Sequence, residues 1–267
     1  MAPTSTRALH LFCFALSAPL PGAVDVEGLD GSPLVLHRRE DLVAVCCEVS
    51  LEDFTGPSGE AHLQDLAWVA PRALRHQEVI ERVQRFSPVF PARFGTLFSS
   101  LEALHRRMDQ HRELIRAFLS RTAQAQEWGL KGFLEEKTAE EHLLDEELAS
   151  AHSLSPGARY LQERKLRTQT GARVRRWASD AAAAVKQELS QEAMEVVERT
   201  VLRGPSEGEP GQMIWNWSFL VPTPVAESFQ ATAAQLNQKL AASGLKLQVV
   251  GPFPPYSFTP RLEEPPA

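Results

Sequence analysis

The stretch MIWNWSFLV, residues 213–221, alternates in the manner of a β-strand with one buried face. Successive side chains of a strand point to opposite faces of the sheet, so every second residue shares a face. One face collects the large apolar side chains, namely Met213, Trp215, Trp217, Phe219 and Val221. The pattern predicts a strand whose apolar face packs on a core.

A helix and a further strand are expected directly after this strand. Thr223 is placed to cap the helix, with Pro224 at its first position, where the missing N–H of proline is not needed. Gly244 is placed to end the helix, because glycine readily adopts the left-handed conformation found there. The expected buried stripe has helical spacing and consists of Val225, Phe229, Ala233, Leu236 and Leu240. Residues 245–250 are expected to form a closing strand.

The residues upstream extend this pattern into a domain. We expect strands at 127–134 and 193–202, a long helix at 156–190, and a loop at 204–211 that joins two strands in a hairpin. The order strand, helix, strand, strand, helix, strand is the ferredoxin-like pattern. The sequence therefore predicts a C-terminal ferredoxin-like (βαββαβ) domain at 123–252, followed by an extended C-terminal tail at 253–267.

Residues 1–122 predict a separate N-terminal α+β domain, so the expected fold class is α+β with two domains. Residues 8–16 are apolar on both faces, which is typical of a buried strand. Simple alternation places His10, Phe12, Phe14 and Leu16 on one face and Leu9, Leu11, Cys13 and Ala15 on the other. Further strands are expected at 33–37, 42–49 and 89–90, and a loop at 53–59.

Two helical regions complete the expected N-terminal domain. The first spans 63–85, and Pro71 should kink it or start a new helix. Its expected apolar stripe is Leu63, Leu66, Ala70 and Leu74, continued by Val79, Ile80 and Val83. The second begins at a capping box formed by Ser99 and Glu102 and ends near residue 122.

Composition and charge argue against some partners. The net charge of −6 disfavours a protein whose main partner is nucleic acid, because phosphate binding needs a basic surface. No run approaches the roughly 20 apolar residues of a membrane span, so no lipid membrane is expected as a partner. The three cysteines, two of them adjacent, are expected to be buried thiols. The acidic run at 135–147 is expected in a loop, and the basic run at 159–176 in a solvated helix.

The residues give no sign of catalytic chemistry. The chain contains no P-loop, GxGxxG, HExxH or GxSxG motif, so we expect no catalytic residue, metal or cofactor, and no enzyme. His105 and His111 lie six residues apart, which is poor spacing for a shared metal. His76, near Glu78, is expected to make a helix-surface or interdomain contact rather than to act as an acid or base.

Two apolar segments stand out as candidate contact regions. The segment PVFPARFGTLF at 88–98 carries one charge, Arg93, and this side chain needs a carboxylate, a group of carbonyls or a partner. It is either a binding loop at a domain junction or a structural element in which Arg93 joins the two halves. Gly95 is expected to supply a turn that a side chain would block.

The second segment is GPFPPYSF, at 251–258. Three prolines hold it extended, and its large aromatic anchors are Phe253, Tyr256 and Phe258. It packs either on its own chain, which we favour, or on another.

These two segments resemble the signatures of a known family. PARFGTLF, at 91–98, is similar to the PxRFGTxF signature of the GvpF/GvpL gas vesicle proteins. GPFPPYSF is similar to that family's C-terminal GPWPPYSF, with Phe253 in place of tryptophan. The stretches LHRREDLVAVCCEV, LRHQEVIERV, EWGLKGFL and PGARYLQERK agree in order, so the resemblance spans nearly the whole chain.

The resemblance implies two α+β domains, the second ferredoxin-like, and a role in forming gas vesicles in the cytoplasm. It implies association with the main shell protein, GvpA, and with other gas vesicle accessory proteins, and it implies no catalytic activity. It also assigns residues 8–16 to the first strand of the domain and not to a signal peptide. The candidate partner-binding or interdomain residues are Arg93, Phe94, Gly95, Phe98, His76, Arg164, Phe253, Tyr256 and Phe258.

Two other functions are compatible with the residues alone. A ferredoxin-like domain can form a small-molecule enzyme or ligand-binding protein, and a deep polar pocket holding His76 or Arg93 with a carboxylate would favour that. A secreted protein cleaved near Ala23 would have a mature N-terminus after Ser17.

Overall fold

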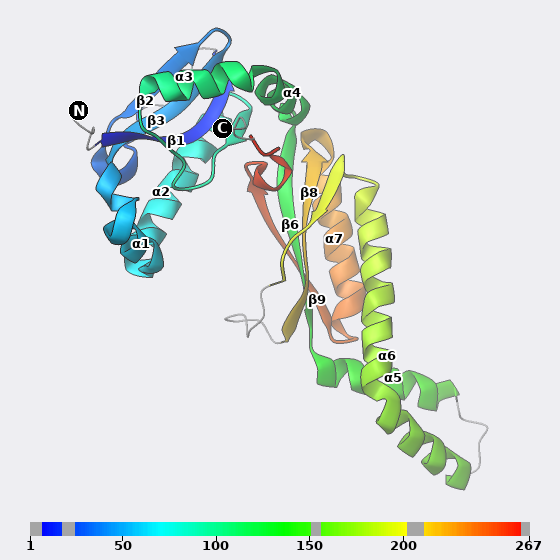
Figure 1. Cartoon of the computed structure of the whole chain (residues 1–267). Helices are drawn as coiled ribbons and strands as arrows, with labels where there is room; N and C mark the ends of the chain where they lie inside the picture. The colour runs from blue at the N-terminus through cyan, green and yellow to red at the C-terminus, as the bar shows by residue number, and fades with distance from the viewer. Residues whose placement is uncertain (1–6, 18–24, 151–155, 202–210, 263–267) are drawn as a thin grey trace. The chain divides into compact units, whose positions relative to one another are not determined.

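A computed structural model describes residues 7–17, 25–150, 156–201 and 211–262. The chain divides into two compact units, each with its own sheet and helices (Figure 1). The first unit comprises Met1–Ala125 and Phe253–Ala267, and the second comprises Gln126–Pro252. The C-terminal tail thus returns to the first unit after the second is complete.

The first unit is built on a five-stranded antiparallel sheet with the order β2-β3-β1-β4, in which β5 also pairs with β1. Its strands are β1 (Arg7–Leu16), β2 (Leu34–Arg39), β3 (Leu42–Ser50), β4 (Val89–Pro91) and β5 (Leu97–Phe98). Its helices are α1 (Gly56–Gln64), α2 (Leu66–Gln84), α3 (Leu101–Gln110) and α4 (Arg112–Thr122). Short 3-10 turns lie at Leu29–Gly31, Leu51–Asp53 and Tyr256–Phe258.

A β-bulge in β1 decides which side chains face which layer. The register of β1 against β3 shifts between Leu11 and Cys13, and the extra residue reverses the alternation beyond it. One face packs with α2 and contributes Ala8, Phe12, Cys13 and Ala15 to the first core. Phe14 lies on the opposite face, where its ring is 6.1 Å from that of Phe90. The prediction that Phe12 and Phe14 share a face is therefore wrong.

The break between α1 and α2 lies at Asp65, not at Pro71. The Asp65 carboxylate accepts a hydrogen bond from the Ala67 amide at 2.9 Å, so Asp65 caps α2 and fixes its start. Pro71 lies inside α2 and is exposed. The loop expected at 53–59 is also wrong in part, since α1 already begins at Gly56.

The expected apolar stripe of α2 divides into a buried and an exposed part. Val79, Ile80 and Val83 are buried in the first core, as predicted. Leu66 and Leu74 are 79% and 66% exposed, so the prediction that they share the buried face is wrong. The buried face of α2 includes His76 instead. Its Nε2 atom lies 3.0 Å from the carbonyl oxygen of Ala92, which directly follows β4.

The second helical region begins one residue later than the capping box indicates, and it is interrupted. The Ser100 hydroxyl accepts a hydrogen bond from the Ala103 amide at 3.2 Å, so Ser100, not Ser99, is the N-cap of α3. His111 separates α3 from α4. On the α3–α4 side of the sheet, the rings of Phe90 and Phe118 lie 4.9 Å apart.

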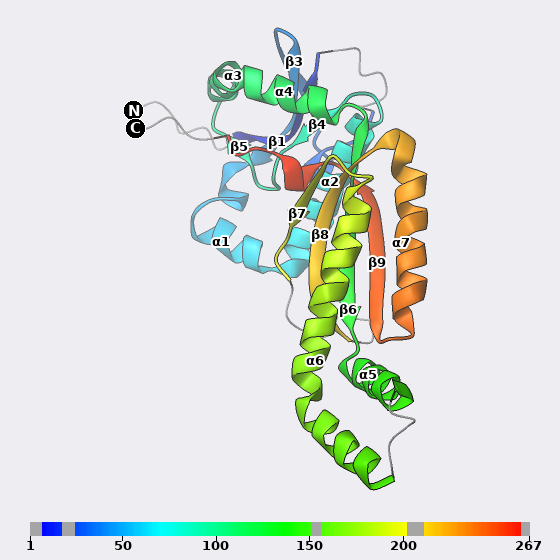
Figure 2. The same cartoon turned by 90° about the vertical axis from the view of Figure 1, so that its right-hand side faces the viewer.

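The second unit contains a four-stranded sheet with the order β7-β8-β6-β9. Its strands are β6 (Ala125–Leu134), β7 (Glu195–Glu198), β8 (Gln212–Pro222) and β9 (Leu245–Phe253), and its helices are α5 (Glu136–Ser150), α6 (Pro156–Ser190) and α7 (Ala226–Ala241). Helices α6 and α7 lie side by side on one face of this sheet (Figure 2). The strand predicted at 213–221 and the helix predicted at 156–190 are both confirmed.

The core of the second unit contains the apolar face of β8. Trp215 and Trp217 stack with ring centroids 5.1 Å apart, and Phe219 and Phe229 pack next to them. Gly244 ends α7 with φ of +81°, as predicted.

Three expectations for the second unit and the tail need correction. The acidic run forms α5 instead of a loop, because Ala139 and Leu143 bury an apolar face against Val174 of α6. Thr223–Val225 form a 3-10 turn, and α7 begins only at Ala226. The tail is not extended throughout, since Tyr256–Phe258 form a 3-10 turn. Most of the loop predicted at 204–211 lies outside the described residues.

Candidate functional site

The signature loop, residues 91–98, is fixed at both ends to one strand. β4 pairs with β1 around Phe14, and β5 pairs with β1 around Leu9. Between these pairings, the Ala92 amide donates to the Phe12 carbonyl at 2.9 Å. The Leu11 amide donates to the Thr96 carbonyl, also at 2.9 Å. The loop is thereby held along one edge of β1.

A tight turn at Gly95 shapes the tip of the loop. The Thr96 amide and hydroxyl both donate to the Arg93 carbonyl, at 3.1 Å and 2.7 Å. Gly95 has φ of +80°, a conformation that side chains disfavour, and a Cβ there would meet no atom within 4 Å. Glycine is thus needed for its backbone conformation, and the predicted turn at Gly95 is confirmed.

Two buried histidines bind the backbone of the signature loop. The Nε2 atom of His76, on α2, lies 3.0 Å from the Ala92 carbonyl oxygen, and the Nε2 atom of His10, on β1, accepts from the Gly95 amide at 3.3 Å. Burial lowers the pKa of His10 to about 3 and that of His76 to about 4, so both rings are neutral near pH 7. His76 is 3% exposed, so its expected helix-surface position is wrong.

The aromatic ring of Phe94 packs on the same two histidines. Its centroid lies 5.7 Å from that of His10 and 5.8 Å from that of His76. Phe54 lies 6.0 Å from Phe94 and joins it to the first core. Phe94 therefore anchors the loop inward, and the neighbouring Arg93 is exposed.

The C-terminal tail packs on the first unit, which is the alternative we favoured from sequence. Phe258 is 5% exposed, and Tyr256 packs against the first core. The Arg121 guanidinium of α4 donates to the Phe258 carbonyl at 3.2 Å. The Arg107 guanidinium of α3 donates to the Leu262 carbonyl at 3.3 Å. These contacts place residues 259–262 beside the signature loop.

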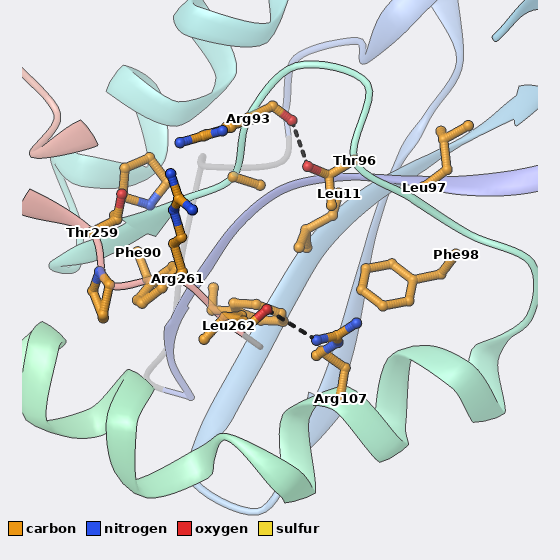
Figure 3. A pocket seen from close by; sticks show the side chains of 14 residues that line it. Leu11, Phe90, Arg93, Thr96, Leu97, Phe98, Arg107, Thr259, Arg261 and Leu262 are labelled. Carbon is orange, nitrogen blue, oxygen red and sulfur yellow. Dashed lines mark hydrogen bonds between the residues drawn. The ribbon is translucent and has the colours of Figure 1, made fainter. Parts of the chain in front are cut away.

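A cavity of about 590 Å³ lies between the signature loop, α3 and the end of the tail (Figure 3). Its apolar lining comes from β1, β4, β5 and the tail, and includes Leu11, Phe14, Phe90, Leu97, Phe98 and Leu262. Its charged lining consists of three arginines, Arg93, Arg107 and Arg261, one from each of the three segments. The signature loop and the four residues that follow GPFPPYSF thus contribute to one site within the first unit.

The described lining residues of this cavity carry positive charge and no negative charge. Among the described residues that line it, none is an aspartate or a glutamate. Within the described part of the chain, the exposed side chains of Arg93 and Arg261 make no hydrogen bond or ion pair. Arg107, in contrast, contacts the Leu262 carbonyl and, at 3.4 Å, the His111 ring. The cavity can therefore receive an anionic group at Arg93 and Arg261 and an apolar group between them and α3.

The residues singled out from sequence have different positions. Arg93 and Phe98 line the cavity. His76, Phe94 and Gly95 shape or hold the signature loop, and Tyr256 and Phe258 anchor the tail. Phe253 ends β9, is 37% exposed and is not among the lining residues. Arg164 belongs to α6 in the second unit, and its side chain lies outside the described part.

Sequence reasoning missed three important residues of this site. His10 appears in the sequence as one polar residue within an apolar strand, which is a signal for a buried hydrogen bond. Arg261 follows GPFPPYSF by three residues and could have been noted as a charge next to a motif. Arg107 is one of several arginines on its helical region, so only the tertiary structure distinguishes it.

The described residues contain neither a membrane-spanning helix nor a metal-binding cluster. None of their helices is both long and apolar enough to span a membrane. Their histidine, cysteine, aspartate and glutamate side chains form no group of three or more that could hold a metal ion.

The fold and the site define a class of α+β protein with two antiparallel sheets and a basic, partly apolar cavity formed by a loop and the C-terminal tail. Comparison with known proteins identifies the family. Residues 8–260 match the family described as gas vesicle synthesis protein GvpL/GvpF, and the chain belongs to this family.

Individual relatives agree with this assignment. The chain is 28% identical to gas vesicle protein L of Streptomyces sp. (strain CB03234) over 260 residues, which cover 95% of the chain and 94% of that protein. It is 31% identical to gas vesicle protein F of the same organism over 191 residues, covering 69% and 76%.

Solved structures share the fold. The crystal structure of GvpF from Anabaena sp. PCC7120 matches with a TM-score of 0.69 and 19% identity, covering 96% of this chain and 97% of that one. The crystal structure of GvpF from Microcystis aeruginosa matches with a TM-score of 0.66 and 17% identity, covering 95% and 99%.

Proposed function

We propose that this chain is a non-enzymatic gas vesicle accessory or minor structural protein that binds the main shell protein GvpA and supports vesicle assembly. The observation that carries the proposal is the convergence of the signature loop and of residues 259–262, which directly follow GPFPPYSF, on one cavity. Its two exposed arginines without partners in the described chain, beside an apolar lining, are suited to binding another protein chain. We expect the protein to act in the cytoplasm, at the growing vesicle, together with other gas vesicle proteins.

A physical need for such a partner exists in any apolar shell. Shell subunits that are apolar enough to enclose gas expose apolar surface before they polymerise, and such surface promotes aggregation. A protein that covers part of this surface would keep subunits available for assembly. Binding alone accounts for this role, so the proposal includes no catalytic step.

We also assign a ferredoxin-like topology to the second unit. The strand order β7-β8-β6-β9 and the order of helices along the chain support this assignment, with α5 as an added helix before α6. We further propose that residues 1–122 and 123–252 act as separate domains and that the tail at 253–267 serves the first.

Co-purification tests the proposal directly. Affinity-tagged chain, produced in a cell that makes gas vesicles, should retain GvpA, and deletion of its gene should reduce or abolish vesicles seen by electron microscopy. Restoring the wild-type gene should restore the vesicles. If no gas vesicle protein co-purifies and the deletion strain forms normal vesicles, the proposed function is wrong.

The alternative, a small-molecule enzyme or ligand-binding protein, has less support. The cavity of about 590 Å³ has the size of a ligand site and includes Arg93. However, no carboxylate from the described part of the chain accompanies Arg93 in the lining, and His76 is engaged with the Ala92 carbonyl. The paired groups that would favour acid–base chemistry are therefore not brought together there.

A further inference from the structure

We infer that the cavity binds a side-chain carboxylate of an otherwise apolar peptide segment, with the carboxylate at Arg93 and Arg261. This inference rests on the proposed function for the identity of the partner, a gas vesicle protein. Its chemical content rests on the cavity itself.

The two guanidinium groups come from different parts of the chain and share one cavity. Arg93 belongs to the signature loop and Arg261 to the tail, 168 residues apart in sequence. In the view of Figure 3 both are drawn at the same end of the cavity, and Arg107 is drawn at the other. Like charges repel, and this repulsion is relieved when an anion binds between them. Guanidinium groups also offer paired donors that match a carboxylate.

The remaining lining favours an apolar neighbour of that carboxylate. Leu97 and Phe98 are drawn on the side of the cavity away from Arg93 and Arg261 in Figure 3, with Phe98 next to Arg107, and Leu11 also lines the cavity. A free phosphate or a nucleic acid would leave this apolar surface unused, and the chain as a whole carries a net charge of −6. A peptide segment that crosses the cavity can place its acidic side chain at Arg93 and Arg261 and an apolar side chain against Leu11 and Leu97.

The site is held in a fixed shape before any partner arrives. His10 and His76 hold the signature loop, and Arg107 holds the Leu262 carbonyl of the tail. A preorganised site loses less conformational entropy when it binds. Arg93 and Arg261 are exposed, so their substitution is expected to leave the fold intact.

The test uses the full chain, model peptides and purified GvpA. The first probe is acetyl-Ala-Leu-Glu-Leu-Ala-amide, compared with the same peptide carrying glutamine in place of glutamate. The acidic peptide should bind more tightly by on the order of tenfold, because one charge-assisted pair is lost in the glutamine peptide. Arg93→Gln and Arg261→Gln should each remove most of this preference, and Arg85→Gln, an exposed arginine outside the cavity, should retain it.

The same variants are then compared in GvpA binding, which separates the two ideas. If wild-type chain binds GvpA and the Arg93→Gln/Arg261→Gln variant binds it equally well, the inference is overturned and the proposed function stands. If wild-type chain does not bind GvpA but still prefers the acidic peptide, the proposed function fails and the carboxylate site stands. Equal binding of the acidic and glutamine peptides overturns the inference whatever GvpA does.

Two other occupants are distinguished by further arms. A peptide with glutamine inside and a free C-terminal carboxylate tests for capture of a chain end, and its tighter binding would overturn the side-chain assignment. The chain's own Glu263 and Glu264 follow Leu262 directly in sequence. If Glu263→Gln/Glu264→Gln binds the acidic peptide at least about tenfold more tightly than wild type, the site serves the chain's own end and the inference is overturned.

Discussion

The imidazole rings of His10 and His76 lie edge to face with their centroids 5.0 Å apart, and both bind the backbone of the signature loop. One ring comes from β1 and the other from α2, so the sheet and its covering helix hold the loop together. The pair contributes hydrogen bonds and aromatic packing to Phe94 in the same place. Each ring binds this segment through Nε2, and its Nδ1 atom is buried without a hydrogen-bond partner among the described residues.

Replacing His76 with alanine should destabilise the first unit strongly. The change leaves a cavity and an unpaired Ala92 carbonyl, which together should lower the free energy of unfolding by about 2–4 kcal/mol. Glu78→Ala on the same helix is the control, since Glu78 is exposed and its ion pair with Arg75 should contribute at most about 1 kcal/mol. Chemical unfolding followed by hydrogen exchange of the backbone amides of the first unit measures both, because four of the five tryptophans lie in the second unit and would obscure a fluorescence signal from Trp68. Equal effects of the two changes would refute the anchoring role.

The stability of the first unit should fall on mild acidification. In the unfolded chain a histidine has a pKa near 6.5, whereas His10 and His76 titrate in the folded protein only at about 3 and 4. Between these values the unfolded state binds more protons, so stability is greatest above about pH 6.5 and decreases as the pH falls below it. Each histidine should contribute a slope approaching about 1.4 kcal/mol per pH unit.

His76→Gln provides the comparison for this pH dependence. Its free energy of unfolding should change less steeply than that of wild type between pH 6 and pH 5, because one titrating group has been removed. Carboxylates titrate mainly below this window and are common to both proteins. Identical slopes for the two proteins would contradict the assignment of the pH dependence to His76.

The two phenylalanines of GPFPPYSF should differ sharply in their effect on stability. Phe258 is 5% exposed, and its replacement by alanine should cost about 3–5 kcal/mol in the first unit. Phe253 is 37% exposed, so Phe253→Ala should cost about 1 kcal/mol or less. Thermal unfolding of the two variants checks this. A larger loss for Phe253→Ala would mean that the tail packs differently.

The exposed leucines of α2 should tolerate polar replacement. Leu66→Gln and Leu74→Gln should change the free energy of unfolding by no more than about 0.5 kcal/mol, because both side chains are largely exposed. Ile80→Ala on the buried face should cost about 2–5 kcal/mol. Denaturant unfolding of the three variants tests the register of α2. A strong loss for Leu74→Gln would place Leu74 in the buried face.

The sequence could predict those elements whose periodicity is unbroken. The strand at 213–221 repeats one alternating pattern over its whole length and is confirmed, as is the long helix at 156–190. Where one extra residue or one cap decides the outcome, prediction failed. The bulge in β1 moves Phe14 to the opposite face, and Asp65 sets the start of α2 ahead of Pro71. Bulges and caps such as these do not alter the spacing of apolar residues in the sequence. The spacing therefore could not predict them.

For the site, the sequence by itself determined which segments matter. PARFGTLF and GPFPPYSF are unusual as continuous strings, so the family and both contact segments could be read from residue order alone. Only the tertiary structure decided that Arg93, Arg107 and Arg261 line one cavity and that His10 and His76 hold the loop. The reason is that a cavity joins residues far apart in sequence. Its shape depends on how strands pair and helices pack, and neither is expressed in the periodicity of any single segment.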